Sequence, residues 1–251
     1  MSATNVFLPG GYRYIPAVFQ YSGGVAAEAG FEIERARFQR PVPLEEAFKR
    51  IEAHLQSIGR PLTAFCQCEL RSPAPFTEDG FRAFNRVYVG TLERWGLFAN
   101  ERNPVARSNV CPLIDPPSAP SFYAFSYTVP ARRSNARATF VIAGSGEAPE
   151  GKPNYRDFIV RRGDVSPEGL REKARFVLGE QERRMALLGF SWRDVTSTHV
   201  YSVHDIHPLM RTEILSRGAA PGGATWHYCR PPVVDLDYEM DCRGLSREVI
   251  L

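Results

Sequence analysis

The sequence predicts an α+β protein built from two similar halves, and three observations carry this prediction. Short β-branched and aromatic segments alternate with long amphipathic segments in the first 130 residues. A similar order returns in residues 136–251. In each half a glycine, Gly59 or Gly189, directly follows a helical segment, as is typical of a helix C-terminus. We therefore expect two tandem domains, residues 1–130 and 136–251, joined near Pro130 to Ala136.

The first half is predicted to contain three strands and two helices. Apolar residues from Leu44 to Ile58 recur at helical spacing, and Thr77-Glu78-Asp79 has the hydroxyl and the acids that suit a helix N-terminus. The predicted elements are, in order, a strand over residues 19–25 that ends in a glycine turn, a helix over 44–58, a strand over 64–70, a helix over 77–95 and a strand over 121–129.

The second half is predicted to repeat this outline with a substitution at one position. Its predicted elements are a strand over residues 139–144, a helix over 166–188, a strand over 194–203 and a final strand over 233–242. Where the first half has Ala106-Arg107-Ser108, the second has Ala224-Thr225-Trp226. We therefore expect the second half to be degenerate and to lack an arginine of its own.

Arg107 is the leading candidate for a binding residue. It lies in Asn103–Val110, where a loop becomes a strand-like run. The planar guanidinium offers a fork of donors that matches the two oxygens of a carboxylate, and it keeps its charge when partly desolvated. A surface arginine in an ordinary ion pair is the alternative interpretation.

Three short segments in the first 130 residues resemble the Rid family, also called YjgF or L-PSP. They are Ser22-Gly23, Phe84-Asn85 with Tyr88, and Ala106-Arg107-Ser108. The resemblance implies a fold of two tandem Rid-like (chorismate-mutase-like) domains, each a mixed β-sheet packed against two helices. It also implies that Arg107 holds a substrate carboxylate near Asn85, and that the site lies at a seam between neighbouring domains of a trimer.

The final predicted strand offers acids that the first half lacks. Rid deaminases commonly carry a glutamate in the strand after the arginine, and Ser121–Tyr127 has no acid. In residues 233–242 four acids alternate with apolar residues, which predicts an acidic face. That face is either solvated or directs one acid, Glu239, into the seam. His227 is a second candidate for proton transfer, because histidine titrates near neutral pH.

Composition limits the partners of the protein. The 251 residues include 31 Lys and Arg against 28 Asp and Glu, a net charge of +3, and the basic residues are scattered. We therefore expect no nucleic-acid partner. No apolar stretch is long enough to cross a bilayer, and the N-terminal residues lack the pattern of an export signal. The expectation is a soluble, cytoplasmic protein without a membrane partner.

The sequence predicts neither a metal site nor a cofactor. Five cysteines are an odd number, without two CxxC pairs, so no disulfide framework is expected. Of three nearby histidines, His199 and His204 face opposite sides of a strand, and His207 precedes a proline. Gly144-Ser145-Gly146 is predicted to be a glycine turn without the rest of a phosphate-binding or dinucleotide-binding motif.

Together these features and the Rid resemblance predict a cofactor-independent hydrolytic deaminase. The expected substrate is a small carboxylated enamine or imine, 2-aminoacrylate-like or 2-aminomuconate-like, that releases ammonia. Two alternatives stay open: a chorismatase-like hydrolase acting on a carboxylated ring, and a non-catalytic protein that binds a small carboxylate. The expected roles are a carboxylate clamp (Arg107), a polar group that holds the nitrogen end (near Ser22, Tyr12 or Tyr14), and a group that directs water (Glu239 or His227).

Overall fold

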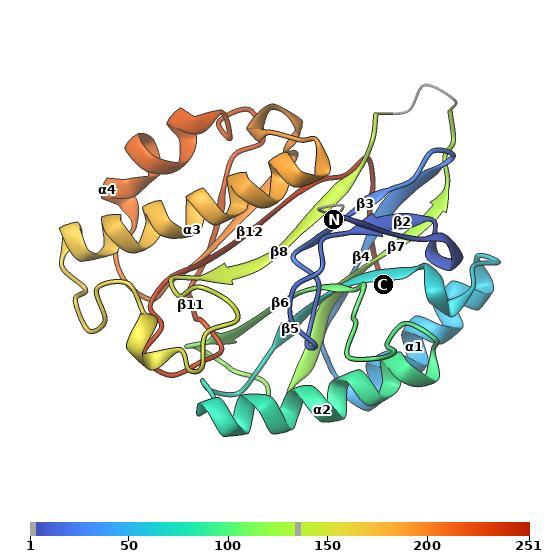
Figure 1. Cartoon of the computed structure of the whole chain (residues 1–251), viewed down its shortest axis with the longest axis horizontal. Helices are drawn as coiled ribbons and strands as arrows, with labels where there is room; N and C mark the ends of the chain where they lie inside the picture. Colours follow the sequence, from blue (N-terminus) through green and yellow to red (C-terminus); the bar gives the residue numbers. More distant parts are fainter. Residues whose placement is uncertain (1–3, 134–136) are drawn as a thin grey trace.

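The computed structural model of the chain describes residues 4–133 and 137–251 as an α+β fold with two mixed sheets (Figure 1). The expected junction near Pro130 to Ala136 lies partly outside the described residues. The strands are β1 (Asn5–Phe7), β2 (Tyr12–Tyr14), β3 (Gly24–Ala27), β4 (Phe31–Pro43), β5 (Phe65–Arg71), β6 (Ala106–Pro112), β7 (Ser121–Pro130), β8 (Phe140–Gly146), β9 (Ser197–Tyr201), β10 (Thr225–His227), β11 (Cys229–Arg230), β12 (Glu239–Gly244) and β13 (Glu248–Ile250).

Three helices of at least 14 residues cover these sheets. They are α1 (Leu44–Ser57), α2 (Glu78–Arg94) and α3 (Pro167–Leu188), and the short α4 (His207–Leu209) runs on into a helical stretch that ends at Arg217. The hydroxyl of Thr77 accepts a hydrogen bond from the Gly80 amide at the start of α2, as its sequence predicts. None of the helices described in residues 4–133 and 137–251 is long and apolar enough to cross a membrane.

The two sheets contain the same arrangement of four strands. One sheet has the order β11-β6-β5-β7-β4-β13 and the other β1-β2-β3-β8-β12-β9-β10. In each, a parallel pair (β5 with β6, β9 with β10) is followed by two antiparallel neighbours (β7 and β4, β12 and β8). Arg107 on β6 and Thr225 on β10 therefore occupy corresponding strands, which agrees with the substitution seen in the sequence.

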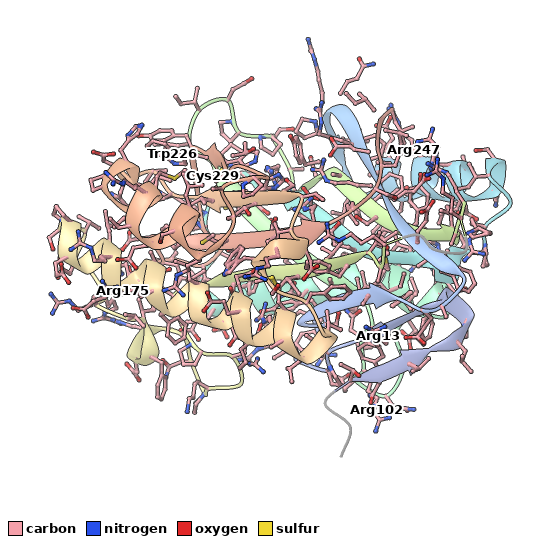
Figure 2. All side chains as sticks on the ribbon, turned by 90° about the horizontal axis from the view of Figure 1, so that it is seen from above. Arg13, Arg102, Arg175, Trp226, Cys229 and Arg247 are labelled. Atoms are coloured by element: carbon pink, nitrogen blue, oxygen red, sulfur yellow. The ribbon has the colours of Figure 1, made fainter. Side chains whose placement is uncertain are left out.

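The terminal strands are exchanged between the halves. β3 pairs with β8, with Val25 opposite Val141, so β1 to β3 extend the sheet of the second half. β13 pairs with β4, with Val249 opposite Ala36, and so completes the sheet of the first half. In Figure 2, Arg247 just before β13 lies on the opposite side of the view from Trp226 and Cys229. The boundaries 1–130 and 136–251 therefore do not separate the two sheets.

The core has three apolar layers. α1 and α2 pack on the outer face of the six-stranded sheet, around Phe48 and Tyr88. α3 packs on the outer face of the seven-stranded sheet, around Val177 and Met240. A smaller apolar cluster that includes Tyr12 lies with Ala106 and Val141 where the two sheets meet. The second half thus has one long helix, α3, and a shorter helical stretch from α4 to Arg217, whose Leu209 and Ile214 lie in the same apolar cluster.

Three sequence predictions about local structure were wrong. Residues 19–25 do not form a strand ending in a turn: Val18 and Tyr21 pair in a tight turn, and β3 begins at Gly24. Gly24 lies so close to the neighbouring strand that a Cβ would be 2.9 Å from the Val141 carbonyl oxygen. Gly144 to Gly146 form the end of β8, not a turn. In residues 233–242 the strand begins only at Glu239, because Asp235 turns the chain with a φ of 72°.

Candidate active site

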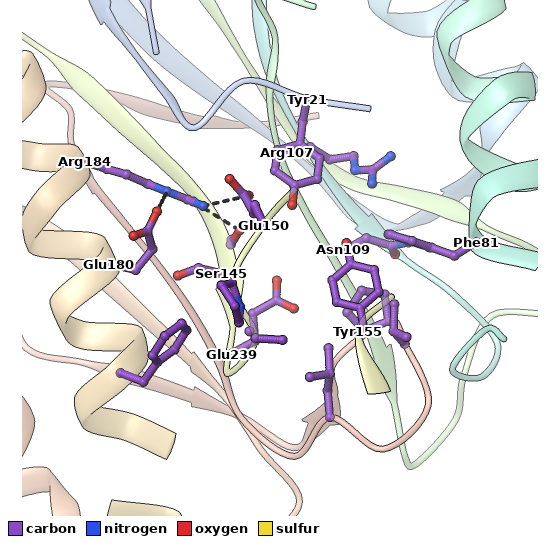
Figure 3. Close-up of a pocket in the computed structure, with 18 of the residues that line it drawn as sticks. Tyr21, Phe81, Arg107, Asn109, Ser145, Glu150, Tyr155, Glu180, Arg184 and Glu239 are labelled. Carbon is purple, nitrogen blue, oxygen red and sulfur yellow. Dashed lines mark hydrogen bonds and ion pairs between the residues drawn. The ribbon is translucent and has the colours of Figure 1, made fainter. Parts of the chain in front are cut away.

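A cavity of about 410 Å³ lies between α2 and α3, on the side where β6 and β8 meet. Figure 3 shows Arg184 and Glu180 on one side of it and Arg107, Asn109 and Phe81 on the other, with Glu239 and Ser145 between them. Both halves of one chain supply its walls, so these walls do not require a neighbouring copy. The Rid-like trimer stays a prediction.

Arg107 places a positive charge in this cavity with little solvent around it. The residue is 3% exposed, and Nη1 donates a hydrogen bond to Oδ1 of Asn85 on α2. The rings of Tyr21, Phe81 and Tyr88 lie 5.2–5.3 Å from its guanidinium carbon, which lets them stabilise a cation. Among the described residues Arg107 makes no ion pair with a carboxylate. A buried cation without a paired anion is costly, so this position suits the binding of an anion.

Glu239 brings a carboxyl group with unusual acidity to the same cavity. Burial raises the pKa of Glu239 well above that of an ordinary glutamate, the negative charge of Asp241 raises it further, and Arg107 only partly opposes this. The residue is 4% exposed. Glu239 therefore keeps its proton to higher pH than an ordinary glutamate does, which suits it to donate a proton.

Gly144 makes room for the Glu239 carboxyl group. A Cβ atom on residue 144 would overlap Oε1 of Glu239 and would lie 3.2 Å from the Cα of Ser108 on β6. The glycine at the end of β8 therefore allows β6, β8 and the carboxyl group to come together.

Asp241, two residues along the same strand, is held in the opposite protonation state. Burial alone would raise the pKa of Asp241, but Arg243 and His199 hold it below the usual value. Its Oδ2 accepts hydrogen bonds from Ser108 (2.6 Å) and Tyr201 (2.8 Å). Two carboxyl groups on the same strand face whose pKa values are shifted in opposite directions is an arrangement that enzymes use to separate proton donors from fixed charges.

Behind Asp241 a buried network of charges joins the two sheets. Arg35 on β4 donates two hydrogen bonds of 2.7 Å to Glu69 on β5, and Arg243 on β12 contacts both Glu69 and Asp241. Burial alone would raise the pKa of Glu69, but Arg243 and Arg35 hold it well below the usual value. Because every member is buried, this network fixes the position of β12 relative to β5.

The segment between β8 and α3, residues 147–166, covers part of the cavity. Its Tyr155 faces Glu150, Arg107 and Glu239; burial and the charge of Glu150 raise the pKa of Tyr155 to about 12. The carboxylate of Glu78, at the start of α2, accepts hydrogen bonds from the amides of residues 155 (3.0 Å) and 156 (3.2 Å). This contact ties the covering segment to the first half of the chain.

With this geometry established, comparison with known proteins identifies the family. A sequence model described as "2-aminomuconate deaminase CnbZ" matches residues 4–249. The chain belongs to the CnbZ family. A 2-amino-5-chloromuconate deaminase of Comamonas testosteroni is 58% identical to it over 246 residues, which is 98% of each sequence.

Solved structures bear on the fold of this CnbZ-family chain alone. A chorismatase is similar with a TM-score of 0.55 at 12% identity, covering 88% of this chain and 77% of the other. The YjgF gene product of E. coli covers 43% of this chain and is itself covered to 81%, with a TM-score of 0.30 at 16% identity. The second match is too weak to carry an argument, so the Rid relationship stays a prediction.

The structure brings Arg107, Asn85 and Glu239 to this site of the CnbZ-family chain but places four other candidates elsewhere. The Tyr12 hydroxyl donates to the Phe65 carbonyl (3.2 Å) and the Ser22 hydroxyl donates to the Pro104 carbonyl (3.2 Å). Tyr14 accepts a hydrogen bond of 3.4 Å from Asn5. All three are buried parts of the scaffold, because their hydroxyls satisfy neighbouring groups.

His227 lies between the sheets, outside the cavity. Its ring stacks on Tyr201 at 5.1 Å and lies 4.8 Å from the ring of His199. Burial and the nearby Arg71 lower the pKa of His227 to about 4, and burial and Arg243 lower that of His199 to about 3. Both rings are therefore neutral at physiological pH. In residues 4–133 and 137–251 we find no group of three or more His, Cys, Asp or Glu that could hold a metal ion.

Sequence reasoning missed the residues that the covering segment and α3 contribute. Arg184 lies fully buried on α3 and donates to Glu150 and Glu180, each at 2.8 Å. In the sequence it is one of an adjacent pair of arginines, and no local pattern distinguishes it from its exposed neighbour Arg183. The helical spacing of four from Glu180 could have indicated an ion pair, but burial could not have been inferred from it.

Proposed function

We propose that this protein hydrolyses a 2-aminomuconate, replacing the amino group by oxygen and releasing ammonia without a cofactor. Membership of the CnbZ family and the high identity to a 2-amino-5-chloromuconate deaminase support a deaminase of this class. The observation that carries the proposal is the shared cavity of Arg107, a buried cation without a carboxylate partner among the described residues, and Glu239, a buried carboxylic acid.

Arg107 binds the carboxylate next to the carbon that bears nitrogen. Its position is fixed by Asn85, whose carbonyl oxygen accepts from Nη1, and the remaining donors of the fork are directed to the substrate. The rings of Tyr21 and Phe81 provide flat apolar surfaces on which a conjugated diene can lie. This anchoring removes much of the entropic cost of reaching a reactive geometry.

Glu239 first acts as the acid. Its carboxyl proton moves to the enamine carbon as the C=C electrons form the new C–H bond, and the nitrogen lone pair forms a C=N bond. The resulting iminium ion is the electrophile. The Glu239 carboxylate then takes a proton from a water molecule. The water oxygen bonds to the iminium carbon as the C=N π electrons return to nitrogen, which gives a carbinolamine.

Glu239 then completes the exchange. It gives its proton to the nitrogen and accepts the hydroxyl proton, while the C–N bond breaks with its electrons on nitrogen. Ammonia leaves, a 2-oxo acid remains, and Glu239 is protonated again. The raised pKa suits this role, because the resting group must carry the proton at neutral pH.

The test is ammonia release from 2-aminomuconate by wild type, Arg107→Ala and Arg107→Lys. We expect kcat/KM to fall about 100-fold or more in Arg107→Ala, the scale of losing an orienting clamp. The kcat/KM of Arg107→Lys should lie between those of wild type and Arg107→Ala, because lysine keeps the positive charge but not the forked pair of donors. Arg50→Ala, which removes an exposed arginine paired with Glu46 on α1, is the matched control and should leave the rate unchanged.

Two results would contradict parts of this proposal, and two more would then separate the alternatives. An Arg107→Ala variant as active as wild type would remove Arg107 from the site. No release by wild type would overturn the deaminase. Binding of the substrate without turnover would then favour a carboxylate-binding protein, and turnover of chorismate would favour the chorismatase-like alternative.

A further inference from the structure

We infer that Asn109, assisted by Ser145, forms a second carboxylate subsite in the same cavity and makes the protein selective for enamines with two carboxylates. This inference rests on the proposed function and deepens it, because it concerns the distal end of the substrate. Both side chains line the cavity that holds Arg107 and Glu239.

Asn109 offers a hydrogen-bond donor that the described residues leave unused. The residue is 3% exposed, and its Oδ1 accepts a hydrogen bond of 2.9 Å from the Ser72 hydroxyl. The amide is oriented with its oxygen toward Ser72, so its nitrogen is directed away from that hydroxyl. The Nδ2 group is buried and has no hydrogen-bond partner among the described residues. Because an unsatisfied buried donor is costly, the amide is placed to receive an acceptor from a ligand.

The position of Asn109 suits a diacid whose other end is at Arg107. The two residues are separated by one position on β6, so their side chains leave the same face of the strand. Their Cα atoms are about 6.6 Å apart in a regular strand. An extended six-carbon diacid has a comparable reach between its two carboxylates. A substrate lying along β6 can therefore contact both residues.

Ser145 supplies a second donor from β8. Its hydroxyl oxygen accepts a hydrogen bond of 2.8 Å from Nε2 of Gln181 on α3. The oxygen is thereby used as an acceptor, and no group in the described part of the chain accepts a hydrogen bond from this hydroxyl. Ser145 is 7% exposed and lines the cavity, so the free hydrogen can serve a ligand.

The other arginines of the cavity are already engaged. Arg184 donates to two carboxylates, Glu150 and Glu180, and to the carbonyl oxygens of residues 143 and 144. Arg183 is paired with Glu180 and its side chain is 55% exposed. Among the described residues of the cavity, Arg107 is therefore left as the cation for one carboxylate of the substrate. Asn109 and Ser145 are left as neutral donors for the other carboxylate.

Two non-hydrolysable probes test the subsite directly. trans,trans-Muconate and sorbate share the same conjugated diene, but sorbate has one carboxylate in place of two, and neither carries the amino group. Titration calorimetry gives the Kd of each for wild type, Asn109→Ala, Ser145→Ala and Arg107→Ala. Gln56→Ala, which removes an exposed amide on α1, is the matched control.

We expect wild type to bind muconate about 10-fold or more tightly than sorbate, the value of a hydrogen bond to a charged group. Asn109→Ala should lose most of this preference while its Kd for sorbate stays within about threefold of wild type, which also shows that the variant is folded. Ser145→Ala should lose part of the preference. Arg107→Ala should weaken both probes, and Gln56→Ala should change neither.

Equal affinity of wild type for both probes would overturn the second subsite. So would an Asn109→Ala variant that keeps the full preference for muconate or weakens both probes equally. The proposed deaminase is judged separately by ammonia release from wild type, which can succeed while the preference for muconate is absent. The two proposals can therefore fail independently.

Discussion

Replacing Glu239 by glutamine should stabilise the protein at neutral pH and abolish its activity. The amide has nearly the shape of the carboxyl group, so it fits beside Gly144, but it cannot ionise. In wild type, burial and Asp241 raise the pKa of Glu239 in the folded state, whereas the unfolded chain loses this proton near its ordinary pKa. Protonated Glu239 therefore contributes its whole stabilising effect below the pKa that it has in the unfolded chain. This contribution to the free energy of unfolding is lost as pH rises toward the pKa of Glu239 in the folded state.

The size of the effect follows from proton linkage. Each pH unit through which folded Glu239 keeps a proton that the unfolded chain has lost costs about 1.4 kcal/mol. Between pH 5 and pH 7 the advantage of Glu239→Gln over wild type should therefore grow by up to about 3 kcal/mol. Other titrating groups cancel in this comparison, because both proteins contain them.

Urea unfolding of both proteins at several pH values measures this difference, and ammonia release measures activity. We expect kcat to fall about 100-fold or more, the usual contribution of general acid–base catalysis. An advantage that is constant with pH, or that grows toward acid, would refute the protonated carboxyl group. An active Glu239→Gln variant would refute its role as the acid.

Three further substitutions test the scaffold of the site. Gly144→Ala should reduce kcat about 100-fold, because the methyl group would displace the Glu239 carboxyl from β8; a kcat within threefold of wild type would show that the overlap is relieved elsewhere. Glu69→Ala should destabilise the protein by about 3–5 kcal/mol in urea unfolding, because it leaves two buried arginines without their shared carboxylate; a loss below about 1 kcal/mol would mean that the network contributes little. His227→Phe should reduce the slope with which the free energy of unfolding falls between pH 6.5 and about 4. The pKa values of His227 and His199 are lowered in the folded state, so the unfolded chain takes up protons at higher pH than the folded protein does. An unchanged slope over this range would show that His227 is not neutral in the folded state.

In the first half the helices α1 and α2 and the strands β5 and β7 were predictable because their patterns are local, whereas β4 was missed. The apolar spacing from Leu44 and the start at Thr77 depend on neighbours along the chain, and α1 and α2 lie where these patterns placed them. The strand predicted over residues 233–242 was wrong in its first half, because alternation of polar and apolar residues in the sequence does not reveal a turn. Asp235 adopts a positive φ there, which breaks the expected acidic face and leaves Glu239 and Asp241 on the strand.

The site was only partly predictable because its parts are distant in sequence. Arg107 could be singled out by its place at a strand start, and Glu239 by its place among alternating acids. Tyr155 reaches the cavity through a long connecting segment, and Arg184 through burial of one helix face. Tyr12 looked available in sequence, but a backbone carbonyl already occupies its hydroxyl. Such contacts depend on packing between elements, which local patterns do not encode.

The exchange of terminal strands determines when each of the two sheets can be completed during synthesis. β3 can pair with β8 only after β8 has been synthesised, more than a hundred residues later. β4 gains its second neighbouring strand only when β13 has been synthesised. Folding therefore depends on long-range pairings, which are slow to form and leave apolar strand edges open meanwhile. Because residues of both sheets line the cavity, a nascent fragment that ends before β12 lacks one of its walls. The cavity is thus complete only after β12 has joined β8 and β9.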